Sequence, residues 1–235
     1  YDVSAKGISD IFLQKVARTV QLLLDPNASG IDKEKQAKVI DGMANENNEG
    51  NFGTGPTVQR IGYINSGQYV RSFLDDDAGD YYPGLTSTEY SYRAKDYVWE
   101  FPDDNSSGSG IPGWSGYTVG GQVTEVLEHV LHTISQHGLH YAYPDELNIT
   151  SGNTGPMMAA MQEAITNSVF NVSGYAALND GSNEYFAAIA REYQYLLCYA
   201  MWEYYSVYVA GGSLSPEWND NSRTASGVLT NNPLG

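Results

Sequence analysis

All four histidines of the chain fall within residues 129–140, and two of them follow two glutamates along a predicted helix. Residues three or four positions apart share one face of a helix. Glu125 and His129 form one such pair, and Glu128 and His132 form another. Imidazole and carboxylate groups one turn apart are how many proteins hold zinc, with a further ligand supplied from elsewhere in the chain. The spacing therefore predicts a metal site on this helix.

An amphipathic helix whose glutamates and histidines pair on a solvated face is the simpler alternative. Here, however, apolar positions surround the polar ones: Val123, Val126, Leu127, Val130, Leu131 and Ile134. Polar groups flanked in this way are expected to lie partly buried, where a missing partner is costly. A metal site, present or ancestral, is therefore preferred. His137 and His140 follow the predicted helix end, where a partly positive imidazole is favoured as a cap.

Three short segments resemble parts of the zincin metallopeptidases. Leu127–Thr133 is similar to their active-site helix, with the first two letters of H-E-x-x-H exchanged to give E-H-x-x-H. Ser182–Ala188 resembles the glutamate helix of the anthrax-lethal-factor-like gluzincins, and Ser173–Tyr175 resembles the segment that carries their catalytic tyrosine. The elements follow in the same order, over roughly residues 115–205. The resemblance implies a zincin-like domain with a metal-site helix and a downstream glutamate helix.

The resemblance also implies a role for each matching residue. Glu128, His132 and Glu184 take the positions of the three metal ligands. His129 takes the position of the catalytic glutamate and would serve as the general base, and Tyr175 takes that of the tyrosine that stabilises the oxyanion. A set with two carboxylates still binds zinc, but it lowers the effective charge of the metal and its power to acidify water.

A second alignment of the same helix stays open, because it also resembles the inverted H-x-x-E-H motif with glutamate as its first letter. Glu125 and His129 then bind the metal, Glu128 is the base, and Glu203 is the candidate for the third ligand. The first alignment is preferred because it gives roles to the downstream tyrosine and glutamate. Glu192 is expected to support the site or to form a salt bridge.

Hydrophobic periodicity predicts an α+β, mainly helical fold with a small strand and loop region. Helices are expected over residues 8–24, 32–43, 122–137, 156–169 and 183–209, and strands over residues 59–64, 69–73 and 97–101. The predicted regions are an N-terminal helical hairpin at residues 1–45, a loop and short-strand region at 46–116, and a zincin-like helical core at 117–235. These regions are expected to form one compact unit.

Two acidic segments have side chains suited to Ca²⁺. The Asp25–Asp32 loop places oxygen side chains at alternating positions before a glycine, as the start of an EF-hand does. The pattern then departs, because Gln36 stands where the bidentate glutamate is expected. A plain helix–turn–helix connection is preferred there, and a solvated loop is preferred for Asp75–Asp80.

The composition excludes several kinds of partner. With 28 acidic and 12 basic residues, the net charge of −16 argues against binding nucleic acid or anionic membranes. No apolar run approaches the roughly 20 residues of a membrane span. One cysteine excludes an intrachain disulfide, and the many glycines and tyrosines favour an extracellular or cell-surface protein. The chain starts at Tyr1, which indicates a processed product or a portion of something longer.

Two functions follow from these patterns. The first is an extracellular zincin-like protein that binds Zn²⁺ and acts as a divergent metallopeptidase on peptide or protein substrates. The alternative is a catalytically inactive structural or adhesive extracellular subunit, which self-associates through tyrosine-rich surfaces. Whether the protein is an enzyme depends on the chemistry of the exchanged motif.

Overall fold

The computed structural model describes residues 8–44, 57, 59–65, 68–70, 97–101, 119–149, 155–179, 182–204 and 217–235. These residues form a mainly helical α+β structure, as the sequence predicts. The chain divides into two compact units, Tyr1–Thr133 and Ile134–Gly235. None of the helices in the described ranges combines the length and apolar character needed to cross a bilayer.

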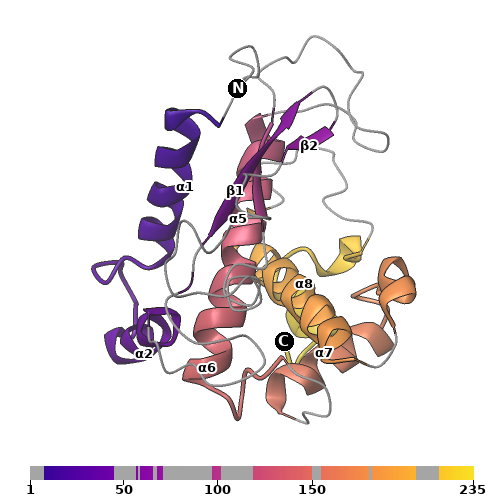
Figure 1. Cartoon of the computed structure of the whole chain (residues 1–235). Coiled ribbons are helices and arrows are strands. Elements are labelled where there is room, and N and C mark those ends of the chain that lie inside the picture. The colour runs from indigo at the N-terminus through magenta and orange to yellow at the C-terminus, as the bar shows by residue number, and fades with distance from the viewer. Residues whose placement is uncertain are drawn as a thin grey trace. The chain divides into compact units, whose positions relative to one another are not determined.

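The helices and strands follow the predicted order, and Figure 1 labels most of them. Their bounds are α1 (Asp10–Leu23), α2 (Lys33–Ala44), β1 (Arg60–Asn65), β2 (Gln68–Val70), β3 (Tyr97–Glu100), α5 (Val119–Ile134), the π-helix η2 (Ser135–Leu139), α6 (His140–Ala142), α7 (Pro156–Thr166), the 3₁₀-helix η3 (Ser173–Leu178), α8 (Asn183–Met201), η4 (Asp220–Ser222) and α10 (Ala225–Asn231). The predicted helices and strands are present where the structure describes the chain, and most ends differ by a few residues. The helix expected to reach residue 209 ends at Met201, and residues 205–209 of that helix and 71–73 of the second strand lie outside the described residues.

Helix α1 begins at a serine cap that also reaches the sheet of the first unit. Ser9 Oγ accepts the N–H of Phe12 at 3.1 Å, which satisfies one of the donors left open by the first turn. The N–H of Ser9 donates to the carboxylate of Glu100, at the end of β3, at 2.7 Å. Phe12 and Val16 form the buried side of the helix. These contacts join α1 to β3.

The connection between α1 and α2 is a helix–turn–helix in which the carboxylates serve the backbone. Asp25 accepts the N–H two residues later at 2.8 Å, and Asp32 accepts two N–H groups at the start of α2. Gly30 has a φ of +80°, a conformation that glycine adopts without strain. This geometry is that of the preferred plain connection. Asp75–Asp80, the other candidate for calcium, lies outside the described residues.

The described sheet has three strands in the order β2-β1-β3, with β2 antiparallel and β3 parallel to β1. Side chains of α5 bond to the backbone of β3. The N–H of Trp99 donates to Glu125 Oε1 at 3.1 Å, and Gln122 Nε2 donates to the carbonyl of Trp99 at 2.8 Å. The N–H of Phe101 donates to Gln122 Oε1 at 2.6 Å. These bonds fix the position of α5 against the sheet.

The second unit is built around α8. The rings of Phe170, Tyr193 and Trp218 lie with their centroids 6.0 to 6.3 Å apart, and all three side chains are buried. Phe170 and Trp218 also form an isolated antiparallel bridge. Burial of such large aromatic side chains is the main stabilising contribution expected in this unit.

One buried asparagine ties the C-terminal end of the chain to α7 and α8. Asn232 is 0% exposed. Its Oδ1 accepts the hydroxyl of Tyr193 at 2.8 Å, and its Nδ2 donates to the carbonyl of Ala160 at 2.9 Å and to Glu163 Oε2 at 2.8 Å. Every hydrogen-bonding atom of this side chain therefore has a partner, which is the arrangement that burial requires.

Candidate metal centre

Three residues predicted to do chemistry, Glu128, His129 and His132, lie on α5, which continues directly into the π-helical segment η2. Ser135, Gln136, His137 and Gly138 of that segment are all buried. Short π-helical segments are rare and occur frequently at functional sites. The helix that carries the exchanged motif therefore has an unusual continuation immediately after it.

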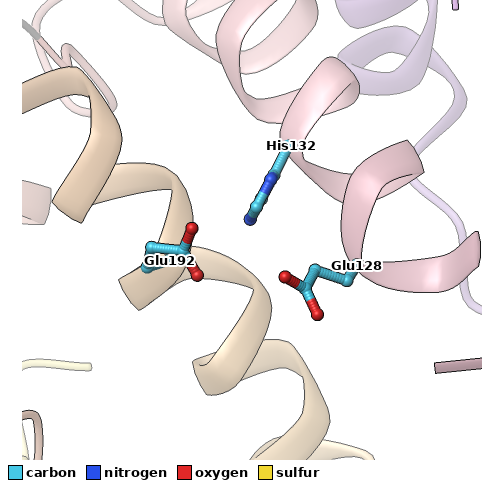
Figure 2. A group of neighbouring side chains, drawn as sticks. All are labelled: Glu128, His132 and Glu192. Atoms are coloured by element: carbon cyan, nitrogen blue, oxygen red, sulfur yellow. The ribbon is translucent and has the colours of Figure 1, made fainter. Parts of the chain in front are cut away.

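Three side chains come together near this helix. Glu128, His132 and Glu192 each offer one ligand atom, and these atoms all lie within 4.8 Å of one another. Figure 2 shows Glu128 and His132 on α5 and Glu192 on α8, with their polar ends turned toward one another. His132 is 3% exposed, and both glutamates are half-buried. Within the described ranges, these three are the histidine, cysteine or acidic side chains that lie close enough to one another to share a metal ion.

The group could hold a metal ion, and its ligand types are among those that zinc uses. Zinc bonds to histidine and carboxylate ligands are about 2.0–2.2 Å long, so the ligand atoms of a tetrahedral site lie roughly 3.3–3.6 Å apart. Separations of no more than 4.8 Å therefore close to that value by movements of glutamate side chains. Three protein ligands are also the number that catalytic zinc sites use, with the fourth position left to water or substrate.

The structure brings together two of the three residues expected to be ligands, Glu128 and His132, and a different glutamate lies beside them. Glu184 lies in the first turn of α8, and its side chain is outside the described residues. Glu192 lies two turns further along α8 and approaches the other two ligands. Its spacing of eight residues from Glu184 places both on nearly the same helix face, which is the only sequence signal that pointed to it.

Tyr175, the predicted oxyanion-stabilising residue, lies in η3 next to one of these ligands. Its hydroxyl is hydrogen-bonded to the carboxylates of Glu192 and Glu217. Burial, followed by these two negative charges, raises the pKa of Tyr175 well above its usual value. The phenol is therefore protonated at neutral pH, and its single proton serves one carboxylate at a time.

Glu217 is a residue that sequence reasoning missed. It precedes Trp218 in the chain, and its carbonyl accepts the N–H of Asn171 at 2.7 Å. That bond and the Phe170–Trp218 bridge hold this segment beside η3. No motif in the sequence marks Glu217, because its place beside Tyr175 comes from packing between segments far apart in the chain.

His129, the predicted base, is paired with Glu125. Its Nε2 lies 3.2 Å from Glu125 Oε1, the same oxygen that accepts the N–H of Trp99. Its ring meets that of His132 edge-on, with 5.4 Å between centroids. A carboxylate on one imidazole nitrogen fixes the ring orientation and makes the other nitrogen more basic. Glu125 therefore holds Nε2 of His129 and orients its ring.

Glu125 and His129, the two ligands in the alternative alignment, differ in geometry from a pair of side chains that share a metal ion. Their facing atoms contact each other, and Glu125 also holds the backbone of β3. Glu203, the third ligand in that alignment, follows the end of α8 as an exposed residue with a φ of 52°. The preferred alignment therefore has the better geometric support.

The other two histidines are both buried rather than placed at a solvated helix end. His140 Nδ1 accepts the N–H of Ile149 at 3.2 Å. Burial lowers the pKa of His140 from its ordinary 6.5 to about 4, so the ring is neutral at pH 7. The role of a partly positive cap, predicted from its position in the sequence, is therefore wrong for His140.

The lowered pKa of His140 predicts an acid-sensitive component of stability. Between pH 6.5 and about 4 the unfolded chain binds a proton at this residue that the folded protein does not. Stability is therefore lost as the pH falls through this window, by about 3 kcal/mol in all. The His140→Asn variant keeps an oxygen that accepts the N–H of Ile149 but does not titrate. Urea unfolding of both proteins at several pH values is expected to show a difference that changes by this amount, and a difference independent of pH would contradict the assignment.

The resemblance to zincins rests on the three short segments around Glu128, Tyr175 and Glu184. The comparisons with known proteins give no relative from which a function could be transferred to this chain. The chemistry assigned to it therefore depends on the geometry of its own residues. No protein-family model matches the chain, and no curated protein or solved structure is significantly similar to it.

Proposed function

We propose that this chain is an extracellular zincin-like zinc protein that acts as a divergent metallopeptidase. The observation that carries the proposal is the approach of Glu128, His132 and Glu192 to within 4.8 Å of one another. The position of Tyr175 against Glu192, and of His129 against His132, supports it. Two residues that the zincin resemblance singles out for catalysis thus each contact a member of the group.

Each residue would have a distinct part in peptide hydrolysis. Glu128, His132 and Glu192 would hold the zinc ion, which when bound polarises a substrate carbonyl and acidifies water. His129, oriented by Glu125, would accept a proton from water and return it to the departing amine. The Tyr175 hydroxyl donates a hydrogen bond to Glu192, since carboxylates that bind a metal are commonly held in position by a further hydrogen-bond partner. Two carboxylate ligands lower the effective charge of the metal, so slow turnover is expected.

Metal content tests the proposal directly. Protein purified without chelators is expected to contain about one zinc per chain by elemental mass spectrometry, and Glu128→Gln is expected to lose it. Glu146→Gln, which changes an exposed glutamate, is the matched control and should retain the metal. Absence of any metal in the unaltered protein would overturn the proposal. The inactive adhesive subunit would then be favoured, and self-association at micromolar concentration would be its own test.

The identity of the third ligand gives a separate prediction. Glu192→Gln is expected to weaken zinc binding by about 100-fold or more, since even outer-sphere changes cost 10–100-fold. Glu184→Gln is expected to change the affinity less than about tenfold, because the structure brings Glu192 to the group. Competition with a chromophoric chelator measures both dissociation constants. The reverse order of effects would return the ligand role to Glu184.

A further inference from the structure

One arginine next to Glu192 has no acidic partner among the residues that the structure describes. Arg191 directly precedes Glu192 on α8, and its guanidinium donates to Gln136 Oε1 of η2. That is its sole polar partner among the residues the structure describes. The chain has 28 acidic and 12 basic residues, so an arginine that meets no carboxylate stands out against its composition. A half-buried charge without a counter-charge carries a cost that a bound anion would remove.

Three buried N–H donors around Arg191 also have no acceptor among the described residues. Arg191 Nε, Gln136 Nε2 and Gln194 Nε2 have no hydrogen-bond partner in the described part of the chain. Gln136 is 2% exposed and Gln194 is 8% exposed. Each unsatisfied buried donor costs about 1–3 kcal/mol, so native proteins rarely leave one without a purpose. All three groups are N–H donors, and the missing partner must therefore be an acceptor.

The position of these donors relates them to the metal group. Gln136 follows His132 by four residues, which is one helical turn and a rise of about 6 Å. Arg191 and Gln194 lie three residues apart and so share a face of α8. The donors therefore begin roughly one turn beyond the histidine of the candidate centre.

We propose that Arg191 and Gln136 bind the C-terminal carboxylate of a peptide substrate, an inference that rests on the proposed function. The planar guanidinium presents paired N–H groups that match the two oxygens of a carboxylate. A water molecule would satisfy the donors without balancing the charge. Arg191 is half-buried, so part of its side chain is exposed to solvent.

The proposal implies cleavage at a peptide bond close to the C-terminus, because Arg191 directly precedes Glu192, a member of the metal group. Water adds across that C–N bond, which leaves a new carboxyl group on the shortened chain and an amine on the released C-terminal fragment. The substrate class is thus peptides with a free C-terminus.

The test compares N-acetylglycine with N-acetylglycinamide, which differ only in the carboxylate. Calorimetric titration of the zinc-loaded protein is expected to show millimolar binding of the acid and binding at least tenfold weaker for the amide. Arg191→Gln is expected to lose the preference with zinc content unchanged, whereas Arg18→Gln, at an exposed position, keeps it. Equal binding of acid and amide, or an unchanged preference in Arg191→Gln, would overturn the inference.

A second variant guards against a loss of folding. Gln136→Glu gives Arg191 an internal carboxylate, so it is expected to fold with equal or greater stability and still lose binding of the acid. The same titration on chelated protein separates the two proposals. Arg191-dependent binding of the acid by a chain that holds no zinc would keep the anion site and reject the metallopeptidase. A chain that holds zinc but does not distinguish acid from amide would do the opposite.

Discussion

Zinc at about 1,000 times its dissociation constant is expected to raise the free energy of unfolding by about 4 kcal/mol. The reason is that the ligands lie on α5 and α8, far apart in the sequence, and approach one another only in the folded chain. An ion that binds the folded state and not the unfolded chain stabilises by mass action. His132→Ala is expected to abolish the gain, because it removes the one imidazole of the group. Urea unfolding with zinc and with a chelator measures the increment in each protein.

A second buried histidine provides the control for this experiment. His132→Ala also loses packing, so its stability without zinc falls, and only the increment due to zinc is informative. His140→Asn alters a buried histidine outside the group and is expected to keep the full gain. An equal increment in the unaltered protein and His132→Ala would place the zinc elsewhere.

Asn232→Leu is expected to destabilise the protein by about 3 kcal/mol or more. The substitution keeps the branching at Cγ but adds volume, and it leaves the Tyr193 hydroxyl, the Ala160 carbonyl and a Glu163 oxygen without the partner they have now. Buried groups deprived of a hydrogen bond cost about 1–3 kcal/mol each. Urea denaturation, with tyrosine and tryptophan fluorescence as the signal, measures the change.

The control for this prediction is another asparagine whose side chain bonds to the backbone. Asn167 Nδ2 donates to the carbonyl of Asn231 at 2.9 Å, but the bond is exposed. Asn167→Leu is therefore expected to cost less than about 1 kcal/mol, because water replaces the lost partner. Similar losses in the two variants would show that the buried network contributes no more than a surface bond.

Local structure was largely predictable because each element carries its own periodicity. Apolar residues at helical spacing mark α1, α5 and α8, and the aromatic and β-branched run at residues 97–101 marks β3. The helix that the sequence extends from residue 122 to 137 becomes π-helical at Ser135, a change that no periodicity distinguishes from an α-helix. The type of each element could thus be predicted from the sequence, but the change from α-helix to π-helix could not.

The candidate site was predictable only where its residues lie close in sequence. Glu128 and His132 were found because a spacing of four guarantees a common face. Glu192 is far from Glu128 and His132 in the sequence, and Glu217 reaches its place through a bridge between Phe170 and Trp218, so neither follows from a local pattern. The same holds for the N–H donors of Arg191 and Gln136, which stand out only because they have no acceptor among the described residues.

The bonds between α5 and β3 have a further consequence, for association between chains. Strand β3 is at one end of the described sheet, and a strand in that position normally offers open N–H and C=O groups to any other extended chain. Here Gln122 and Glu125 take up the N–H and the C=O of Trp99 and the N–H of Phe101. The two side chains act in place of a fourth strand. They therefore hinder the addition of another strand at this edge of the described sheet. Such strand addition is one route by which a tyrosine-rich chain would aggregate.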